Sequence, residues 1–168
     1  MNYTGIIKED VCNGPGIRTS LFVSGCNHEC KGCFSKDTWS PDAGEEFTQD
    51  VLNELVEYVS QDYISGLSLL GGDPLTPYNR FQVACIVNKI KDAAPEKTIW
   101  CWTGYIYEDL LNQAKKDNYL NFILNNIDVL IDGPFIEEQK DLTLKWRGSS
   151  NQRIIQLKDN NAIDITEI

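Results

Sequence analysis

Apolar and polar positions alternate in two different rhythms along the chain. Short apolar runs typical of buried strands lie at residues 17–25, 66–72, 97–104, 127–133 and 153–157. Segments of helical character lie between them, at residues 47–60, 76–94 and 107–116. In the first of these, Val51, Leu55 and Val59 are four residues apart and share one helix face. Thr48 and Thr76 precede the first two helices and are their expected N-caps.

This succession of strands and helices predicts an α/β fold in which a mostly parallel sheet is flanked by helices. Runs such as "LSLL" and "VLI" are apolar on both sides, which indicates a sheet covered on both faces. A complete eight-fold β/α barrel takes roughly 250 residues, whereas this chain has 168. We therefore expect a single domain, residues 1–168, with a partial (incomplete) TIM-like β/α barrel: an open, curved sheet of five or six strands.

The overall charge narrows the range of partners. The net charge is −10 and the pI is about 4.5, which argues against non-specific binding to DNA, RNA or an anionic membrane. No apolar run is long enough to cross a membrane, and the first ten residues mix acids with a lysine, unlike a signal peptide. We therefore expect a cytoplasmic protein in a reducing environment, with no nucleic-acid or membrane partner.

Three of the six cysteines are clustered in "CNHECKGCF", at Cys26, Cys30 and Cys33. Three thiolates are one short of a closed tetrahedral zinc site. On a four-iron cluster, where each thiolate binds one iron, they would leave one iron open for a substrate or cofactor. The alternative is a structural zinc site with Cys12 or His28 as fourth ligand, although His28 lies only two residues from both Cys26 and Cys30.

Unusual residues follow each of the first four predicted strands. The cysteines come after the first, and the later stretches are "GGDP" (71–74), "TGY" (103–105) and "DGPF" (132–135). Turn residues are common after strands, so the glycines alone indicate little. Because the carboxyl ends of parallel strands meet at one end of the sheet, we expect the thiols, the glycine pair and two acids to share a ligand site there.

The Cys-x3-Cys-x2-Cys motif followed by Gly-Gly-acid-Pro resembles the radical S-adenosylmethionine (radical SAM) enzymes. In that superfamily the three cysteines hold a [4Fe–4S] cluster, and S-adenosylmethionine chelates the fourth iron. Further motifs are similar to those of the activating proteins of anaerobic (class III) ribonucleotide reductase, between about residues 12 and 155: "CNGPGIRTSLFVSG", "LSLLGGDPL", "WTGY", "VLIDGPF" and "WRGSSNQRII". The resemblance implies that residues 1–168 form one radical SAM domain.

The resemblance also implies roles for individual residues. The implied cluster ligands, which are also the implied catalytic residues, are Cys26, Cys30 and Cys33. The implied cofactor-binding residues are Gly32, Cys33, Phe34, Gly71, Gly72, Asp73 and Pro74. Backbone groups of residues 32–34 would lie near the adenine, Gly71 and Gly72 would admit the methionine, and Asp73 would accept from its amino group. The superfamily often has glutamate where Asp73 stands and an aromatic residue where Gly32 stands, so a ring at position 32 cannot stack on the adenine here.

The implied chemistry is carried by the cofactors. An external one-electron donor such as flavodoxin would reduce the cluster, and S-adenosylmethionine would be cleaved to methionine and a 5′-deoxyadenosyl radical. That radical would take a hydrogen atom from a glycine of the catalytic subunit of anaerobic ribonucleotide reductase, leaving a glycyl radical. Phe34, Trp100, Trp102 and Tyr105 are candidates to wall the pocket, with strand packing as the alternative for both tryptophans and a structural turn for Tyr105.

Two other functions are compatible with the sequence. One is a radical SAM enzyme that acts on another glycyl-radical protein or on a small molecule. The other is a non-catalytic zinc-binding interaction domain. Asp132 is expected either to cap a turn or to lie near the ribose, and Arg18, Arg147 and Arg153 to lie at the surface or in ion pairs. For the "RGSSNQR" loop the resemblance leaves open a contact with the cofactor carboxylate or with the partner.

Overall fold

A computed structural model describes residues 1–158 and 161–167 of the chain. These residues form eight strands: β1 (Asn2–Asp10), β2 (Arg18–Val23), β3 (Glu45–Glu46), β4 (Gly66–Gly71), β5 (Thr98–Trp102), β6 (Val129–Asp132), β7 (Arg153–Lys158) and β8 (Asn161–Asp164). Their four α-helices are α1 (Gln49–Val59), α2 (Arg80–Ala93), α3 (Tyr107–Ala114) and α4 (Asn118–Asn126). Short 3-10 helices lie at Lys36–Thr38 and Glu137–Gln139.

The eight described strands make one open sheet in the order β3-β1-β2-β4-β5-β6-β7-β8. The centre, β2-β4-β5-β6, is parallel, whereas the four outer pairings are antiparallel. The α/β class is confirmed, but the prediction of five or six mostly parallel strands was wrong: the sheet is mixed. The sequence of β1, "NYTGIIKED", shows why, because its charged and half-exposed positions lack the apolar run of a buried strand.

Helix starts follow local capping chemistry only in part. Thr48 caps α1 as predicted, because its side chain accepts from the backbone N–H of Val51. Thr76 does not cap α2, which begins four residues later at Arg80. The Thr76 hydroxyl instead donates to the backbone carbonyl of Asp73 at 3.0 Å and stabilises the turn after β4. In the described part of the chain, none of the helices combines the length and apolarity needed to cross a membrane.

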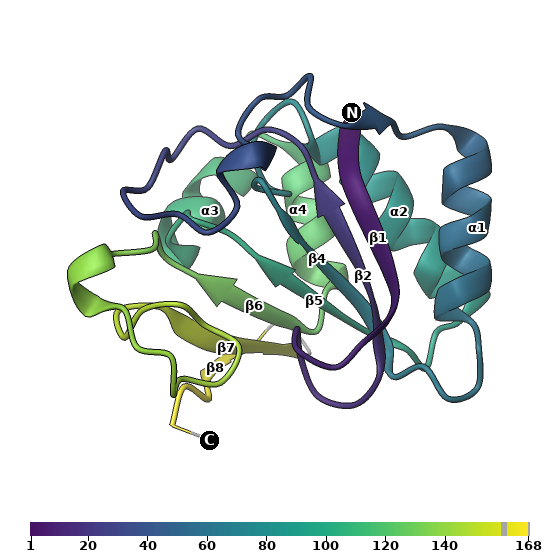
Figure 1. Ribbon diagram of the computed structural model, residues 1–168. Coiled ribbons are helices and arrows are strands. Elements are labelled where there is room, and N and C mark those ends of the chain that lie inside the picture. The colour runs from purple at the N-terminus through teal and green to yellow at the C-terminus, as the bar shows by residue number, and fades with distance from the viewer. Residues whose placement is uncertain (159–160, 168) are drawn as a thin grey trace.

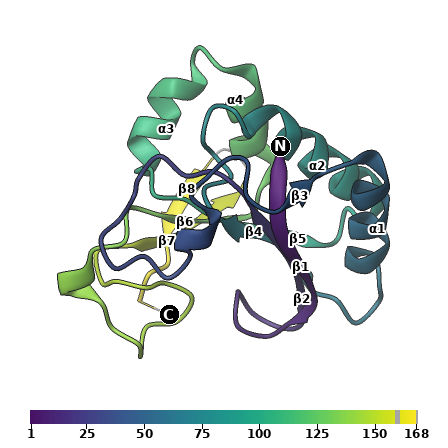
Figure 2. The ribbon, with the colours of Figure 1, turned by 45° about the horizontal axis from the view of Figure 1, so that its top comes forward.

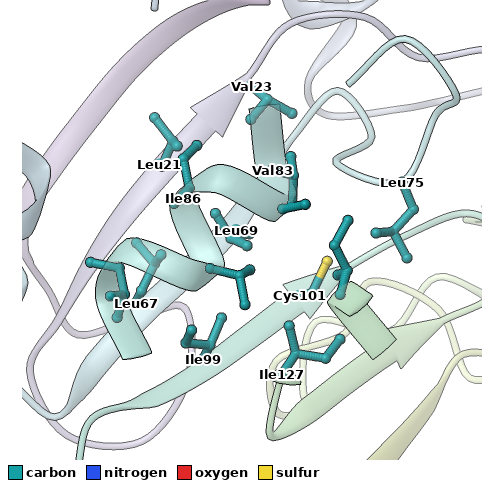
Figure 3. Close-up of a cluster of buried hydrophobic side chains, with 14 of the residues drawn as sticks. Leu21, Val23, Leu67, Leu69, Leu75, Val83, Ile86, Ile99, Cys101 and Ile127 are labelled. Carbon is teal, nitrogen blue, oxygen red and sulfur yellow. The ribbon is translucent and has the colours of Figure 1, made fainter. Parts of the chain in front are cut away.

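The helices gather on one side of the sheet, as Figures 1 and 2 show. The inward side chains of the central strands pack against them in one apolar core, of which Figure 3 shows a part, including Leu21, Leu67, Leu69, Ile99 and Cys101. Each such leucine or isoleucine contributes about 1.5–3 kcal/mol by leaving water. This core is what holds the strand ends in register, and therefore what positions the site.

The opposite face of the sheet carries no α-helix in the described chain. The central strands are nevertheless buried on both faces, as predicted, because consecutive residues of β2, β4 and β6 are buried. Trp100, Val129, Ile131 and Ile154 form a small second cluster there, with Trp146 from the β6–β7 connection packed against it. The physical reason is the strand order: β2, β4, β5 and β6 are added in one direction across the sheet, and right-handed crossovers then place all their helices on the same side. This face is therefore left accessible to the loops that build the pocket.

Candidate functional site

A pocket of about 550 Å³ opens at the carboxyl ends of the four parallel strands. Its lining takes residues from all four post-strand stretches, among them the three clustered cysteines, Gly71–Asp73, Thr103 and Gly104, and Gly133 and Phe135. The expectation that these stretches meet at one end of the sheet is confirmed. A smaller cavity of about 210 Å³, between α3, α4 and β7, has no thiol or carboxylate in its described lining and lacks comparable chemistry.

Cys26, Cys30 and Cys33 lie on the loop that follows β2, which we call the cysteine loop (residues 24–35). Its base is closed by backbone hydrogen bonds, from Gly25 N to Thr38 O at 2.7 Å and from Cys26 N to Trp39 O at 3.0 Å. Figure 2 shows this dark blue segment beside the light green β6–β7 connection. All three thiols are free and half-buried, and all three residues line the pocket. They are therefore accessible to a bound group.

Two opposing influences act on the ionisation of Cys26 and Cys30: burial and nearby backbone N–H groups. Burial raises the pKa of Cys26 to about 11 and also raises the pKa of Cys30. The backbone N–H groups of His28 and Glu29 act against this at Cys26, and that of Phe135 does so at Cys30. Donors aimed at sulfur favour the thiolate, the form that binds metal.

Cys33 completes the pattern, because its sulfur accepts from the backbone N–H of Ser35 at 3.4 Å. Hydrogen bonds to the cysteine sulfurs are a recognised means of tuning iron–sulfur clusters. Among residues 1–158 and 161–167, no three His, Cys, Asp or Glu side chains converge as they would around a single metal ion. A four-iron cluster makes no such demand, because each thiolate binds a different iron. The donor set therefore fits a cluster better than zinc.

The positions of the two candidates for a fourth zinc ligand, Cys12 and His28, also argue against a zinc site. Cys12 is exposed and does not line the pocket in the described structure. His28 lines the pocket, but its imidazole packs against the ring of Tyr105, with ring centroids 4.5 Å apart. Its Nε2 atom lies 2.9 Å from Asp73 Oδ2, so the imidazole lies against the end of β4.

Asp73 lies completely buried beneath the cysteine loop. Its Oδ1 accepts from Leu75 N at 2.8 Å, its Oδ2 accepts from Gly104 N at 2.9 Å, and the Thr103 hydroxyl lies 3.0 Å from both oxygens. A carboxylate offers about four acceptor positions, so the protein already uses most of them. That Asp73 accepts from a methionine amino group stays a prediction.

The glycine pair at the end of β4, Gly71 and Gly72, is required by the chain's own packing. A Cβ on Gly71, whose φ is +112°, would lie 2.6 Å from Val23 N and O. A Cβ on Gly72 would lie 2.4 Å from the carbonyl oxygen of Gly25. Both glycines therefore let the ends of β2 and β4 approach closely. Pro74 is buried behind them and does not line the described pocket.

Comparison with known proteins identifies the family of this chain. Residues 12–155 match the family described as "4Fe-4S single cluster domain". The chain is 46% identical over 156 residues to the anaerobic ribonucleoside-triphosphate reductase-activating protein of Vibrio cholerae, covering 92% of this chain and 97% of that protein. The chain belongs to this activating-protein family.

Two other relatives carry the same name. The activating protein of Enterobacteria phage T4 is 44% identical over 156 residues, covering 92% of this chain and 93% of the relative. That of Escherichia coli K12 is 42% identical over 160 residues, covering 94% of this chain and all of the relative. The likeness to these activating proteins thus extends over nearly the whole chain, well beyond the cysteine motif.

The candidate wall residues of this family member separate into three groups. Trp102 lines the pocket and its Nε1 donates to Trp146 O at 2.7 Å, whereas Trp100 lies deeper, in the second apolar cluster. Their ring centroids are 6.0 Å apart on the same face, as expected for strand packing. Phe34 is fully exposed at the pocket rim. Tyr105 lies behind His28 and does not line the described pocket.

Asp132 and Arg153 have structural contacts. The Asp132 carboxylate accepts from Tyr107 N at 2.8 Å at the start of α3, which matches the capping alternative. Arg153 donates to Asp132 and to Glu108, as an ion-pair residue. Arg147 lines the pocket, but its guanidinium donates to backbone carbonyls of its own loop, among them Gln152 O at 3.0 Å.

The surface position expected for Arg18 was wrong. Its side chain is completely buried, and its guanidinium donates to Ser68 Oγ and to the carbonyl oxygens of Leu67 and Thr98, each at 2.8 Å. It also lies over Trp100, 5.4 Å from the ring centroid. Burial lowers its pKa to about 10. Nothing in "GIRTSLF" distinguishes this arginine from one at a strand start facing water.

Sequence reasoning missed two parts of the site. The first is His28, whose spacing drew attention only as a zinc ligand. The second is the β6–β7 connection (residues 133–152), which supplies a whole pocket wall. It touches the cysteine loop through Lys31, whose Nζ lies 3.0 Å from Glu137 Oε2. The "RGSSNQR" motif was the available signal for this wall.

Proposed function

We propose that this protein is the activase of an anaerobic ribonucleotide reductase and works by reductive cleavage of S-adenosylmethionine. One observation carries the proposal: the three thiols and the Gly71–Asp73 turn line the same pocket at the ends of the parallel strands. The membership of a family named for reductase activation supports the choice of target.

In this proposal Cys26, Cys30 and Cys33 hold a [4Fe–4S] cluster through three thiolates, with one iron left for S-adenosylmethionine. When bound, the reduced cluster would supply the one electron that cleaves S-adenosylmethionine to methionine and a 5′-deoxyadenosyl radical, and that radical would take a hydrogen atom from a glycine of the reductase's catalytic subunit. The protein's own residues then have to bind, orient and exclude water. No general acid or base is needed, which suits a chain with one histidine.

The proposed cofactor contacts are those that the family resemblance implies, and the positions of the lining residues support them. Backbone groups of Gly32, Cys33 and Phe34 lie on the cysteine-loop side of the pocket and are proposed for the adenine. Gly71 and Gly72 lie on the opposite side, at the end of β4, and are proposed for the methionine part. Asp73 and Pro74, both buried, hold that turn from behind.

We assign the fold of this single domain, residues 1–168, to the partial-barrel radical SAM type, with β2-β4-β5-β6 as its parallel part. The open sheet leaves the pocket accessible from the side. Phe34 and Leu142 both line the pocket and are largely or fully exposed, one on the cysteine loop and one on the β6–β7 connection. They are suited to flank an entering segment of the reductase, which would also exclude water from the radical.

The proposal includes a cytoplasmic location. It also includes an external one-electron donor of the flavodoxin kind, because the cluster has to be reduced before S-adenosylmethionine can be cleaved. Anaerobic reconstitution with iron and sulfide tests the core of it. We expect a reduced four-iron electron paramagnetic resonance (EPR) signal that changes when S-adenosylmethionine is added. With the reductase present, a glycyl radical signal should follow.

Other results would redirect the proposal. A protein that binds zinc but forms no cluster supports the interaction-domain alternative. A cluster that responds to S-adenosylmethionine without a glycyl radical on the reductase supports a different glycyl-radical protein or a small-molecule substrate. The Cys26→Ala variant serves as the matched control, because it loses a cluster ligand on an otherwise unchanged loop.

A further inference from the structure

His28 occupies an enclosed position between two cluster-binding cysteines. Its side chain is mostly buried, and its ring lies edge-on to Tyr105. Gly104 leaves it no spare room, since a Cβ on that glycine would come within 2.5 to 2.8 Å of the imidazole. This packing is tight enough to define where the middle of the cysteine loop lies.

The polar end of the same ring faces a single carboxylate oxygen. His28 Nε2 lies 2.9 Å from Asp73 Oδ2, yet it is buried and has no aligned hydrogen bond within the described residues. A buried nitrogen without a hydrogen bond is costly, so the loop gains most when this contact is aligned.

Asp73 is well suited to anchor such a contact. Its carboxylate is completely buried and is held by Thr103 and by the backbone of Gly104, both at the end of β5. The contact from His28 therefore ties the cysteine loop to β4 and β5 together. His28 and Asp73 follow different strands, and through Thr103 and Gly104 their contact links three of the four post-strand stretches that line the pocket.

The geometry has a direct consequence for the first ligand. The backbone N–H groups of His28 and Glu29 favour the thiolate of Cys26. If the His28 ring is displaced, those N–H groups move with it. Hydrogen bonds to cluster sulfurs influence reduction potential, and outer contacts of this kind commonly change metal affinity 10–100-fold.

We propose that His28 and Asp73 form a positioning pair that sets the cysteine loop for cluster binding and thereby tunes the cluster through the N–H groups beside Cys26. The inference rests on the cluster of the proposed function. It gives Asp73 a role that acts through His28, distinct from direct contact with S-adenosylmethionine. In this scheme neither residue binds the cluster, and neither acts as a general acid in the reaction.

Two substitutions of the same histidine test the pair. In His28→Gln the amide nitrogen falls near the place of Nε2 and still reaches Asp73, whereas in His28→Asn the shorter side chain does not. Asp37→Asn, an exposed change in the short 3-10 helix just after the cysteine loop, is the control. The full-length variants are reconstituted with iron and sulfide without oxygen, and three quantities are measured: iron per chain, the EPR line shape, and the fraction of cluster reduced at a fixed reductant ratio.

We expect His28→Asn to bind at least twofold less iron and to change the reduced fraction at least threefold. His28→Gln should recover most of both, and Asp37→Asn should match wild type. Equal values for wild type, His28→Asn and His28→Gln would overturn the inference. So would a His28→Asn protein that is less stable to heat without iron but has unchanged cluster content and line shape.

A failure of the proposed function gives a different pattern. If wild type itself forms no cluster, the proposed function fails, and this inference fails with it. If wild type forms a cluster and responds to S-adenosylmethionine while the histidine variants behave identically, only the positioning pair is refuted. Thr103→Val removes the hydroxyl that holds Asp73 and should reproduce a weaker form of the His28→Asn result.

Discussion

The two faces of the central sheet are built from alternate residues of the same strands, yet they differ in chemistry. Cys101 points into the helix-covered core, where it is completely buried and burial raises the pKa of its thiol well above its ordinary value. Its neighbour Trp102 points the other way and lines the pocket. Ser68 and Leu69 are divided in the same manner between the buried Arg18 and the apolar core.

This difference separates stability from function within a few ångströms. The helix-covered face is apolar and dry, so its residues contribute mainly burial energy. The opposite face and the strand ends carry a guanidinium, a carboxylate and three thiols, which require hydrogen bonds or a bound group. Substitutions on the helix-covered face should therefore lower mainly stability, and substitutions of the thiols should lower mainly cluster content. The following experiments test this difference.

The largest effect is expected for the thiols of the cysteine loop. Cys30→Ala should lose the cluster and reduce glycyl-radical formation on the order of 100-fold or more, with little change in the free energy of unfolding. Cys101→Ala should do the reverse: it keeps the cluster but costs about 1–3 kcal/mol, because it leaves a small cavity. Iron analysis and urea denaturation measure the two outcomes.

Cys12→Ala is the control for both, because this thiol is exposed and outside the pocket. It should change neither iron content nor stability. If Cys101→Ala lost the cluster, or Cys30→Ala retained it, the division between the two faces would be incorrect.

The next effect concerns neighbouring leucines on β4. Leu69 is completely buried under the helices, so Leu69→Ala should cost about 2–5 kcal/mol. Leu70 is half-buried and lines the pocket, so Leu70→Ala should cost less than half as much. Urea denaturation of both variants checks this, and equal losses would contradict the comparison.

Arg18 provides a third test, because it is a charged residue at the base of the polar face. Arg18→Met keeps the apolar stem but removes the donors to Leu67 O, Thr98 O and Ser68 Oγ. We expect a loss of about 1–3 kcal/mol from the unpaired acceptors. Arg18→Ala should lose more, because it also leaves a cavity beside Trp100. An unchanged or more stable Arg18→Met protein would show that burying the charge costs as much as its hydrogen bonds return.

The smallest effect is expected from Glu108, an exposed residue in the first turn of α3 that pairs with Arg153. The hydrogen bond from Arg153 holds the pKa of Glu108 below its ordinary value. A depressed pKa in the folded state contributes stability above the unfolded pKa and loses it as pH falls through the folded pKa. Glu108→Gln should therefore flatten the stability–pH curve below about pH 4.5, by about 0.5 kcal/mol for this exposed pair. Denaturation at pH 7 and pH 3.5 measures the difference, and a steeper curve would contradict the assignment.

The sequence by itself determined the elements that depend on local pattern. The central parallel strands, three of the helices and the Thr48 cap follow from apolar spacing and capping chemistry. The spacing of Cys26, Cys30 and Cys33 and the "GGDP" turn after the next strand also indicated a ligand site at one end of the sheet, because parallel strands bring their carboxyl ends together.

Tertiary structure alone decided which side chains those loops bring into contact. β1 and the outer antiparallel pairings depend on partners distant in sequence, and half-exposed strands leave no apolar run to read. The burial of Arg18 depends on acceptors about 50 and 80 residues away. The contact of His28 with Asp73 joins two strand ends. Pairings of this kind arise only when the sheet has formed, so no local pattern in the chain specifies them.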